Sequence, residues 1–140
     1  MALYGVLGDI HGNREALEAV LARIDAIGVD RLLCVGDVIG YNADPDECVR
    51  ILQSREALCI AGNHDLIGTG QLGFERCSNK AMHSLKRTRR SLGESESLYV
   101  RRLPSHLVLE EKVLLTHGGV RDVQQYMTRE RHFVQNAQFL

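Results

Sequence analysis

Side chains that could bind metal ions or move protons follow short apolar runs of this sequence, each beside or near a glycine. An aspartate such as Asp37 has two oxygens and can bridge two cations about 3.5–4 Å apart, the geometry used for in-line phosphoryl displacement. Carboxylate and amide oxygens mixed with imidazoles suit Mn²⁺, Fe or Zn²⁺ and argue against a thiolate site. The residues concerned are Asp9, His11, Asp37, Asn63, His64, Asp65 and His117.

Each group of these side chains directly follows a predicted strand. We expect strands at 3–7, 31–35 and 57–61, and a hairpin with strands at 107–109 and 113–115. Helical patterns alternate with the first three runs, which predicts an α/β fold around a mostly parallel sheet. If the strands share one sheet with parallel neighbours, their ends converge on the edge where open α/β sheets bind ligands.

Helix signals between the strands are partly explicit. An apolar stripe with helical spacing begins after Asn13 and stops at Gly28. Asp44 as an N-cap, a proline at the first helical position and a capping-box glutamate at Glu47 predict the start of the next helix. The helices that we expect cover 13–27, 45–53, 74–92, 97–103 and 128–140.

The composition is that of an ordinary globular protein. The chain has 140 residues, of which 44% are hydrophobic, with 17 basic and 18 acidic side chains. These values predict one domain, residues 1–140, and argue against a strongly basic nucleic-acid binder. We find no apolar run near the ~18 residues of a membrane span, no export signal and no Cys-x-x-Cys pair. We therefore expect a cytoplasmic protein with no membrane partner and no specific nucleic-acid partner.

Each candidate side chain also has a structural explanation when taken alone. A strand-end aspartate such as Asp9 commonly caps a turn, and a lone histidine such as His117 is more often a satisfied polar group than a ligand. Independent turn residues would not be expected to choose metal-ligand types after four different strands. The joint pattern therefore favours a functional site.

The ordered motifs resemble those of the calcineurin-like metallophosphoesterase superfamily. They read Gly-Asp-x-His-Gly-Asn from Gly8, Gly-Asp-x-x-Gly from Gly36, Gly-Asn-His-Asp from Gly62, and x-His-Gly at His117. Gly-Tyr closing the second motif, followed by Pro-x-Glu-Cys from Pro45, is most similar to the small prokaryotic phosphodiesterase-type branch. The resemblance implies an α-β-β-α sandwich with a mostly parallel first sheet, present here in part.

The same resemblance implies a set of metal ligands. Asp9 and His11 would bind the first of two divalent ions, Asn63 and His117 would bind the second, and Asp37 would bridge both. Mn²⁺ is the expected metal, with Fe, Zn or Ni as alternatives. The implied reaction is hydrolysis of phosphomono- or diesters by in-line attack of a metal-bridging hydroxide.

Catalytic and substrate-binding roles are implied in the same way. His64 would stabilise the transferring phosphoryl oxygen or protonate the leaving group, with Asp65 orienting and charging its imidazole. A neighbouring carboxylate would raise the histidine pKa and fix its tautomer. Asn13 and Tyr41 are candidates for contact with the small phosphoester substrate.

One family motif has no counterpart in this sequence. Members of the superfamily complete the site with Gly-His-x-His, one histidine going to each metal, and this sequence lacks it. We therefore expect a C-terminally incomplete domain, in which an uncovered sheet face would promote homo-oligomers. The alternative function is a binding or scaffold module of phosphoesterase-like fold with weak or no activity.

A run of basic residues covers 86–90. It could bind phosphate or nucleic acid, or its cations could offset the dipole at the end of a helix. Since net charge is near zero and few aromatic residues are interleaved, the sequence favours the helix-end interpretation.

Overall fold

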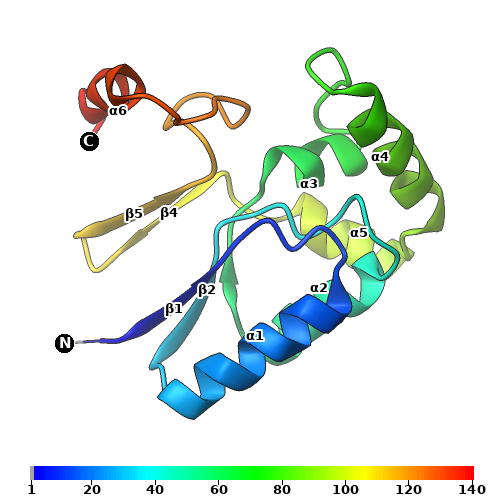
Figure 1. The fold of residues 1–140 in the computed structure, drawn as a ribbon, viewed down its shortest axis with the longest axis horizontal. Helices are drawn as coiled ribbons and strands as arrows, with labels where there is room; N and C mark the ends of the chain where they lie inside the picture. Colours follow the sequence, from blue (N-terminus) through cyan, green and yellow to red (C-terminus); the bar gives the residue numbers. More distant parts are fainter. Residues whose placement is uncertain (1) are drawn as a thin grey trace.

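The computed structural model describes residues 2–140, and its centre is a parallel three-stranded sheet (Figure 1). The sheet has the order β1 (Tyr4–Leu7), β2 (Arg31–Cys34) and β3 (Leu58–Cys59), with both strand pairs parallel. β3 is shorter than predicted because the chain leaves β2 after Ile60. The next amide, that of Ala61, donates to Pro104 O at 2.8 Å instead of to β2. The predicted parallel arrangement of the first three strands is confirmed.

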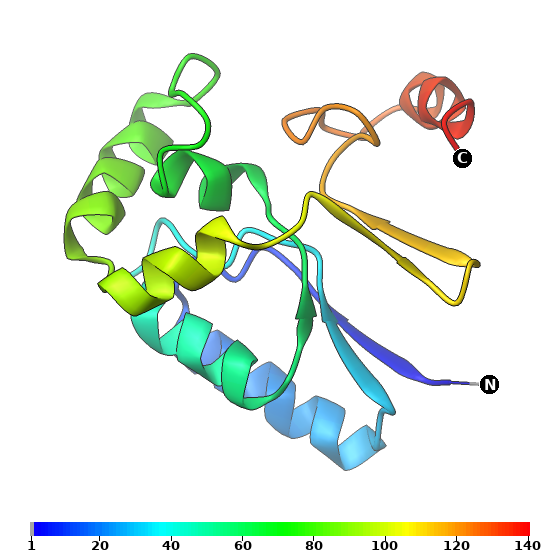
Figure 2. The ribbon, with the colours of Figure 1, turned by 180° about the vertical axis from the view of Figure 1, so that it is seen from behind.

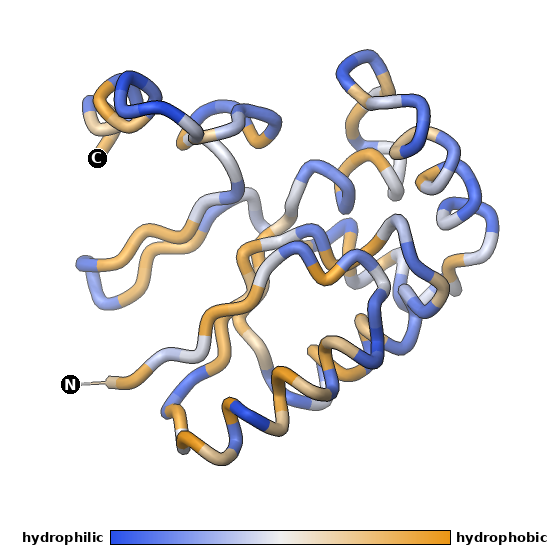
Figure 3. Tube along the Cα trace, viewed as in Figure 1, coloured by the Kyte–Doolittle hydropathy of each residue, from blue (hydrophilic) through white to orange (hydrophobic). Residues whose placement is uncertain are grey.

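A second, antiparallel sheet packs against the first. It consists of β4 (His106–Leu109) and β5 (Val113–Thr116), the predicted hairpin. Leu109 and Leu115 point inward and form a core with Leu33 and Ile60 of the first sheet. Figure 3 shows long hydrophobic stretches along both hairpin strands. The two sheets therefore form the inner layers of the fold.

Helices cover the other face of the first sheet. Buried side chains of α1, α2 and α5 pack with those of the sheet into the larger core. Figures 1 and 2 show α1 and α2 on this side and α6 on the opposite side, next to the hairpin. The helices are α1 (Arg14–Ile27), α2 (Pro45–Ser54), α3 (Asn63–Gly68), α4 (Asn79–Ser91), α5 (Glu94–Arg101) and α6 (Glu130–Ala137).

Helix α1 follows its sequence signals closely. The Asn13 side chain accepts a hydrogen bond from Ala16 N at 3.1 Å, and Gly28 ends the helix with a left-handed φ of 76°. The predicted apolar stripe is only partly buried, because Val20 and Ile27 remain 44% and 55% exposed. The buried side chains that pack α1 against the sheet are Leu17, Leu21 and Ile24.

The other helices differ from the predictions mainly at their ends. Asp44 makes no side-chain capping bond at α2, so that part of the prediction is wrong although Pro45 does begin the helix. α4 begins at Asn79 and not near residue 74, because the Ser78 hydroxyl caps Ala81 N at 3.2 Å. α5 begins three residues early, α6 is shorter than predicted, and α3 was not predicted at all.

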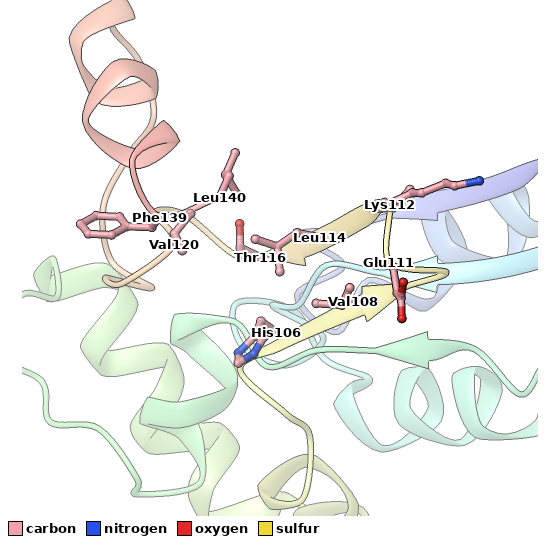
Figure 4. A pocket seen from close by; sticks show the side chains of 10 residues that line it. His106, Val108, Glu111, Lys112, Leu114, Thr116, Val120, Phe139 and Leu140 are labelled. Carbon is pink, nitrogen blue, oxygen red and sulfur yellow. The ribbon is translucent and has the colours of Figure 1, made fainter.

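The outer face of the hairpin carries an open cavity of about 590 Å³. Figure 4 shows Val108 and Leu114 of the strands together with Phe139 and Leu140 near the end of the chain. All four cysteines are free, and Cys77 alone among them is not buried. Across residues 2–140, no helix combines the length and the apolar character that crossing a membrane requires.

Candidate metal centre

The predicted side chains come from the segments that directly follow four strands, three of them from the first turn of α3. Asp9 and His11 follow β1, Asp37 follows β2, and Asn63 follows β3. His117 follows β5, which lies in the second sheet, so the condition of one shared sheet does not hold for this strand. Its loop still reaches the others because the two sheets stack face to face, with Leu115 in their shared core.

Asp37 lies at the centre of the site. Its Oδ2 is 3.7 Å from His11 Nε2, and its Oδ1 is 3.6 Å from His117 Nε2. Ligand atoms of His11, Asp37 and His64 lie within 4.8 Å of one another, and so do those of Asp9, Asp37 and His117. The two groups share only Asp37, so this carboxylate has one oxygen available on each side.

Two of the candidate ligands, His11 and His117, are oriented by backbone carbonyls. His117 Nδ1 lies 2.8 Å from Val35 O, and His11 Nδ1 lies 3.3 Å from Ile39 O. Because a carbonyl only accepts, each neutral ring carries its proton on Nδ1 and presents an unprotonated Nε2. His117 Nε2 lies 3.0 Å from Asn63 Oδ1, and two acceptors this close suit a shared cation.

The electrostatics of Asp37 test whether a metal ion fits. The side chain is 3% exposed, and within residues 2–140 no Lys or Arg forms an ion pair with it. Burial, reinforced by the charge of Asp65, raises the Asp37 pKa to about 8. A buried carboxylate without a cationic partner is unfavourable, and a divalent cation would supply the missing charge. The oxygen and imidazole donors therefore fit divalent metal ions.

Asp65 holds the backbone of the site and not the imidazole of His64. Its Oδ1 accepts from Val38 N at 2.9 Å and Ile39 N at 3.1 Å, and its Oδ2 accepts from Gly62 N at 2.9 Å. His64 Nδ1 has no hydrogen-bond partner. The prediction that Asp65 orients and charges His64 is therefore wrong, because three backbone N–H groups occupy its carboxylate.

His64 sits in a cluster of rings. Its centroid is 4.5 Å from that of His11 and 4.8 Å from that of Tyr41. Burial, with the nearby His11 and His117, lowers the His64 pKa to about 4, so the predicted upward shift is also wrong. A Cβ at Gly40, where φ is 106°, would lie 2.7 Å from His64 Nδ1. The ring can therefore occupy this position only against a glycine.

Four site residues have left-handed backbone conformations. Asp9, His11, Asp37 and Tyr41 have φ values of 52°, 52°, 56° and 42°. Each such conformation costs roughly 1 kcal/mol for a residue with a side chain. Hydrogen bonds between the β1 and β2 loops offset this cost: His11 N donates to Asp37 O at 2.8 Å, and Asp9 N donates to Gly36 O at 3.1 Å. Strain is thus concentrated where the ligands must converge.

The two candidate substrate residues lie at the edge of the centre. The Tyr41 ring is 4.8 Å from the His11 ring and is half-buried. The Asn13 side-chain oxygen accepts the capping bond of α1, and its amide N–H groups can donate to a ligand. Both substrate roles remain predictions.

One part of the site was missed by sequence reasoning. A cavity of about 280 Å³ is lined by Asp9, Asn63 and His117 on one side and by residues 123–127 on the other. Arg76 anchors this loop, because its Nη1 donates to Asp122 Oδ2 at 2.8 Å and its Nη2 to the Gln124 carbonyl at 3.0 Å. The adjacent Gly-Gly turn at 118–119 is the only sequence signal that could have indicated it.

The order of the motifs and this arrangement of ligands define a phosphoesterase class. The sequence profile of the family described as calcineurin-like phosphoesterase matches residues 3–138, and the chain therefore belongs to this family. The resemblance that the motifs indicated is thus confirmed, and so is the mixed α/β fold.

Two relatives and one solved structure show how far the similarity extends. An uncharacterized protein of Methanocaldococcus jannaschii is 31% identical over 123 residues, 84% of this chain and 50% of that protein. A symmetrical bis(5'-nucleosyl)-tetraphosphatase of Pseudomonas putida is 42% identical over 69 residues, 47% of this chain and 24% of that enzyme. A metallophosphoesterase crystal structure from Sphaerobacter thermophilus matches with a TM-score of 0.83 at 28% identity, covering 100% of this chain and 57% of that one. The chain thus spans about half the length of the first relative and of this structure.

Proposed function

We propose that this chain hydrolyses phosphomono- or diesters at a centre of two divalent metal ions, with Mn²⁺ as the expected metal. The observation that carries the proposal is the position of Asp37, whose Oδ2 faces His11 Nε2 and whose Oδ1 faces His117 Nε2. Family membership supports a metal-dependent phosphoesterase in general.

The ligands divide into two sets in this proposal. Asp9 and His11 would hold one ion, Asn63 and His117 would hold the other, and Asp37 would supply an oxygen to each. Bound divalent ions supply a water of lowered pKa and polarise a phosphoryl oxygen. The Nδ1 bonds from the histidines to carbonyls keep each Nε2 lone pair directed at the centre, so the rings need no reorientation.

His64 acts as a neutral hydrogen-bond donor to a phosphoryl oxygen. Its pKa of about 4 means that the ring is uncharged at pH 7 and has no proton in excess to transfer. Nδ1 faces Gly40 without a partner, and leaving a lone pair unpaired costs less than leaving an N–H unpaired. We therefore assign the single proton of the ring to Nε2.

The substrate range includes nucleotide esters in this proposal. The named activity of the Pseudomonas putida relative, symmetrical cleavage of a bis(5'-nucleosyl) tetraphosphate, supports testing them beside simple aryl esters.

Hydrolysis of bis(4-nitrophenyl) phosphate with added Mn²⁺ tests the proposal. Asp37→Asn should lower kcat by at least ~100-fold and should lose bound metal by elemental analysis. His64→Ala should lower kcat by about 100-fold but keep the metal, because it removes a donor and not a ligand. Glu130→Gln, on the exposed first turn of α6, is the control for removing one carboxylate charge. Equal rates for all four proteins would refute the mechanism.

A further inference from the structure

One face of α4 forms an open groove lined by cationic side chains. Its volume is about 390 Å³. Figure 1 shows α4 at the opposite end of the molecule from the β4–β5 hairpin, beside α3. The residues that line the groove are His83, Lys86, Arg87, Arg90 and Ser91.

The charge of the chain is strongly segregated around this groove. Residues 76–93 hold six of the 17 Lys and Arg and no acidic residue, so the remainder has 11 basic against 18 acidic side chains. In the part of the chain that the structure describes, Lys86, Arg87 and Arg90 form no ion pair, whereas Arg50 is paired with two glutamates. A cleft lined by charges of one sign attracts ligands of the opposite sign.

Compensation of the helix dipole explains only some of the cationic side chains of α4. Arg89 and Arg90 occupy the last turn of α4, as dipole compensation predicts. Arg89 is also used structurally, because it donates to the carbonyls of Ile67 and Gly68 at the end of α3. Lys86 and Arg87 precede the last turn, so compensation of the helix dipole does not account for them.

The groove adjoins the metal centre through one residue. Arg87 Nη2 donates to Tyr41 O at 2.9 Å and to Asn42 O at 3.0 Å. The Tyr41 ring in turn contacts His64 in the centre, with 4.8 Å between centroids. Lys80 Nζ lies 5.8 Å from the centroid of the same tyrosine ring. Cationic side chains thus continue from the edge of the centre along α4.

We propose that the α4 groove binds a second phosphoryl group of the substrate while the scissile phosphate lies at the metal ligands. This inference rests on the proposed function. Lys86 and Arg90 supply unpaired cations, and Arg87 retains its Nη1 and Nε N–H groups for a phosphate oxygen. The preferred substrates are phosphoesters that carry a further phosphate, in contrast to esters with a single one.

Two substrates that share one scissile bond test the inference. One is the 4-nitrophenyl ester of thymidine 5'-phosphate, and the other carries an additional phosphate on the 3'-hydroxyl. With Mn²⁺-loaded wild type, we expect the second phosphate to lower KM about tenfold, as one charge-assisted contact would. Lys86→Gln combined with Arg90→Gln should abolish that gain but leave kcat/KM for the simple ester within about twofold.

The control variant removes two cations elsewhere. Arg23 lies exposed on α1 and Arg131 exposed on α6, and neither lines the groove. Arg23→Gln combined with Arg131→Gln has the same net charge as the groove variant and should keep the full gain in KM. If both double variants lose the gain equally, the effect comes from overall charge, and the inference is overturned.

A binding measurement separates this inference from the proposed function. Calorimetry in EDTA should detect inorganic tripolyphosphate binding to wild type, and binding about tenfold weaker to the groove variant. If neither ester is hydrolysed but this difference is found, the proposed function fails and the groove remains an anion site. If wild type and the groove variant bind tripolyphosphate equally well, the inference is overturned. It is also overturned if a twelve-nucleotide single-stranded RNA binds more tightly than tripolyphosphate and this binding depends on the groove.

Discussion

Replacing Asp65 by asparagine should separate stability from activity. The carboxylate is completely buried and accepts three backbone N–H groups, two on Oδ1 and one on Oδ2. Asparagine can keep the bonds from Val38 and Ile39, but its NH₂ group would face the N–H of Gly62. Loss of this charge-assisted bond costs about 1.5–3 kcal/mol.

A second contribution acts in the opposite direction. Burial raises the Asp65 pKa to about 6 from its usual 3.8, so ionisation at pH 7 costs the folded, metal-free protein about 3 kcal/mol. Asparagine removes that cost. The two contributions nearly cancel, and we expect Asp65→Asn to change the free energy of unfolding by less than ~1.5 kcal/mol at pH 7.

The ionisation of Asp65 makes the free energy of unfolding depend on pH. The folded state binds the Asp65 proton more tightly than the unfolded state does. The contribution of Asp65 to the free energy of unfolding of wild type is therefore highest at low pH and falls as pH rises from about 4 to 6. At pH 5 the ionisation cost is only about 1.6 kcal/mol. We therefore compare the free energy of unfolding of the variant minus that of wild type. This difference should be about 1.3 kcal/mol lower at pH 5 than at pH 7.

Denaturant unfolding in EDTA at the two pH values measures these differences, with Asp65→Asn compared in an Asp37→Asn background because the charge of Asp65 also shifts the Asp37 pKa. Activity with Mn²⁺ should fall about 100-fold, because repulsion at Gly62 displaces the neighbouring Asn63 and His64 by a fraction of an ångström or more. Full activity in the variant would refute the positioning role. A loss of more than ~3 kcal/mol in the free energy of unfolding of Asp65→Asn at pH 7 would show that the lost Gly62 bond and the removed ionisation cost do not cancel.

Three further changes have defined outcomes. Gly40→Ala should lower kcat for the aryl diester about tenfold or more, because the new methyl group would meet His64 Nδ1 at 2.7 Å; an unchanged rate would show that the ring can move without loss. His117→Gln should leave one of the two metal ions in elemental analysis, and retention of both would contradict its assignment as a ligand. Asn13→Ala should cost about 1 kcal/mol in denaturant unfolding through loss of the bond to Ala16 N, which an unchanged midpoint would exclude.

The positions of the candidate metal ligands at strand ends could be predicted because they depend on local signals. Apolar runs followed by Gly-Asp or Gly-Asn mark strand ends, and these runs predict the three parallel strands. The start of α1 could be predicted for the same reason, since Asn13 caps an N–H only three residues away.

The role of Asp65 could not be predicted because its partners are distant in sequence. Val38 and Ile39 lie 27 and 26 residues before it, and no local pattern identifies them. Because Asp65 is next to His64 in the sequence, the motif predicts that the two side chains interact. In the structure the Asp65 carboxylate accepts hydrogen bonds from backbone N–H groups instead. α3 did leave a signal, since an acid three residues after Gly62 can bond back to the N–H of the N-cap residue.

The crossed backbone bonds between the β1 and β2 loops bear on how such a centre can be transplanted into another scaffold. Asn42 N donates to His11 O at 2.9 Å, and Asp44 N donates to Gly12 O at 3.1 Å, so each loop is the template for the other. A designer who grafts the Gly8–Asn13 motif alone would obtain the right side chains on a backbone free to relax out of its left-handed turns. The smallest portable unit is the pair of loops together with the parallel strands that deliver them.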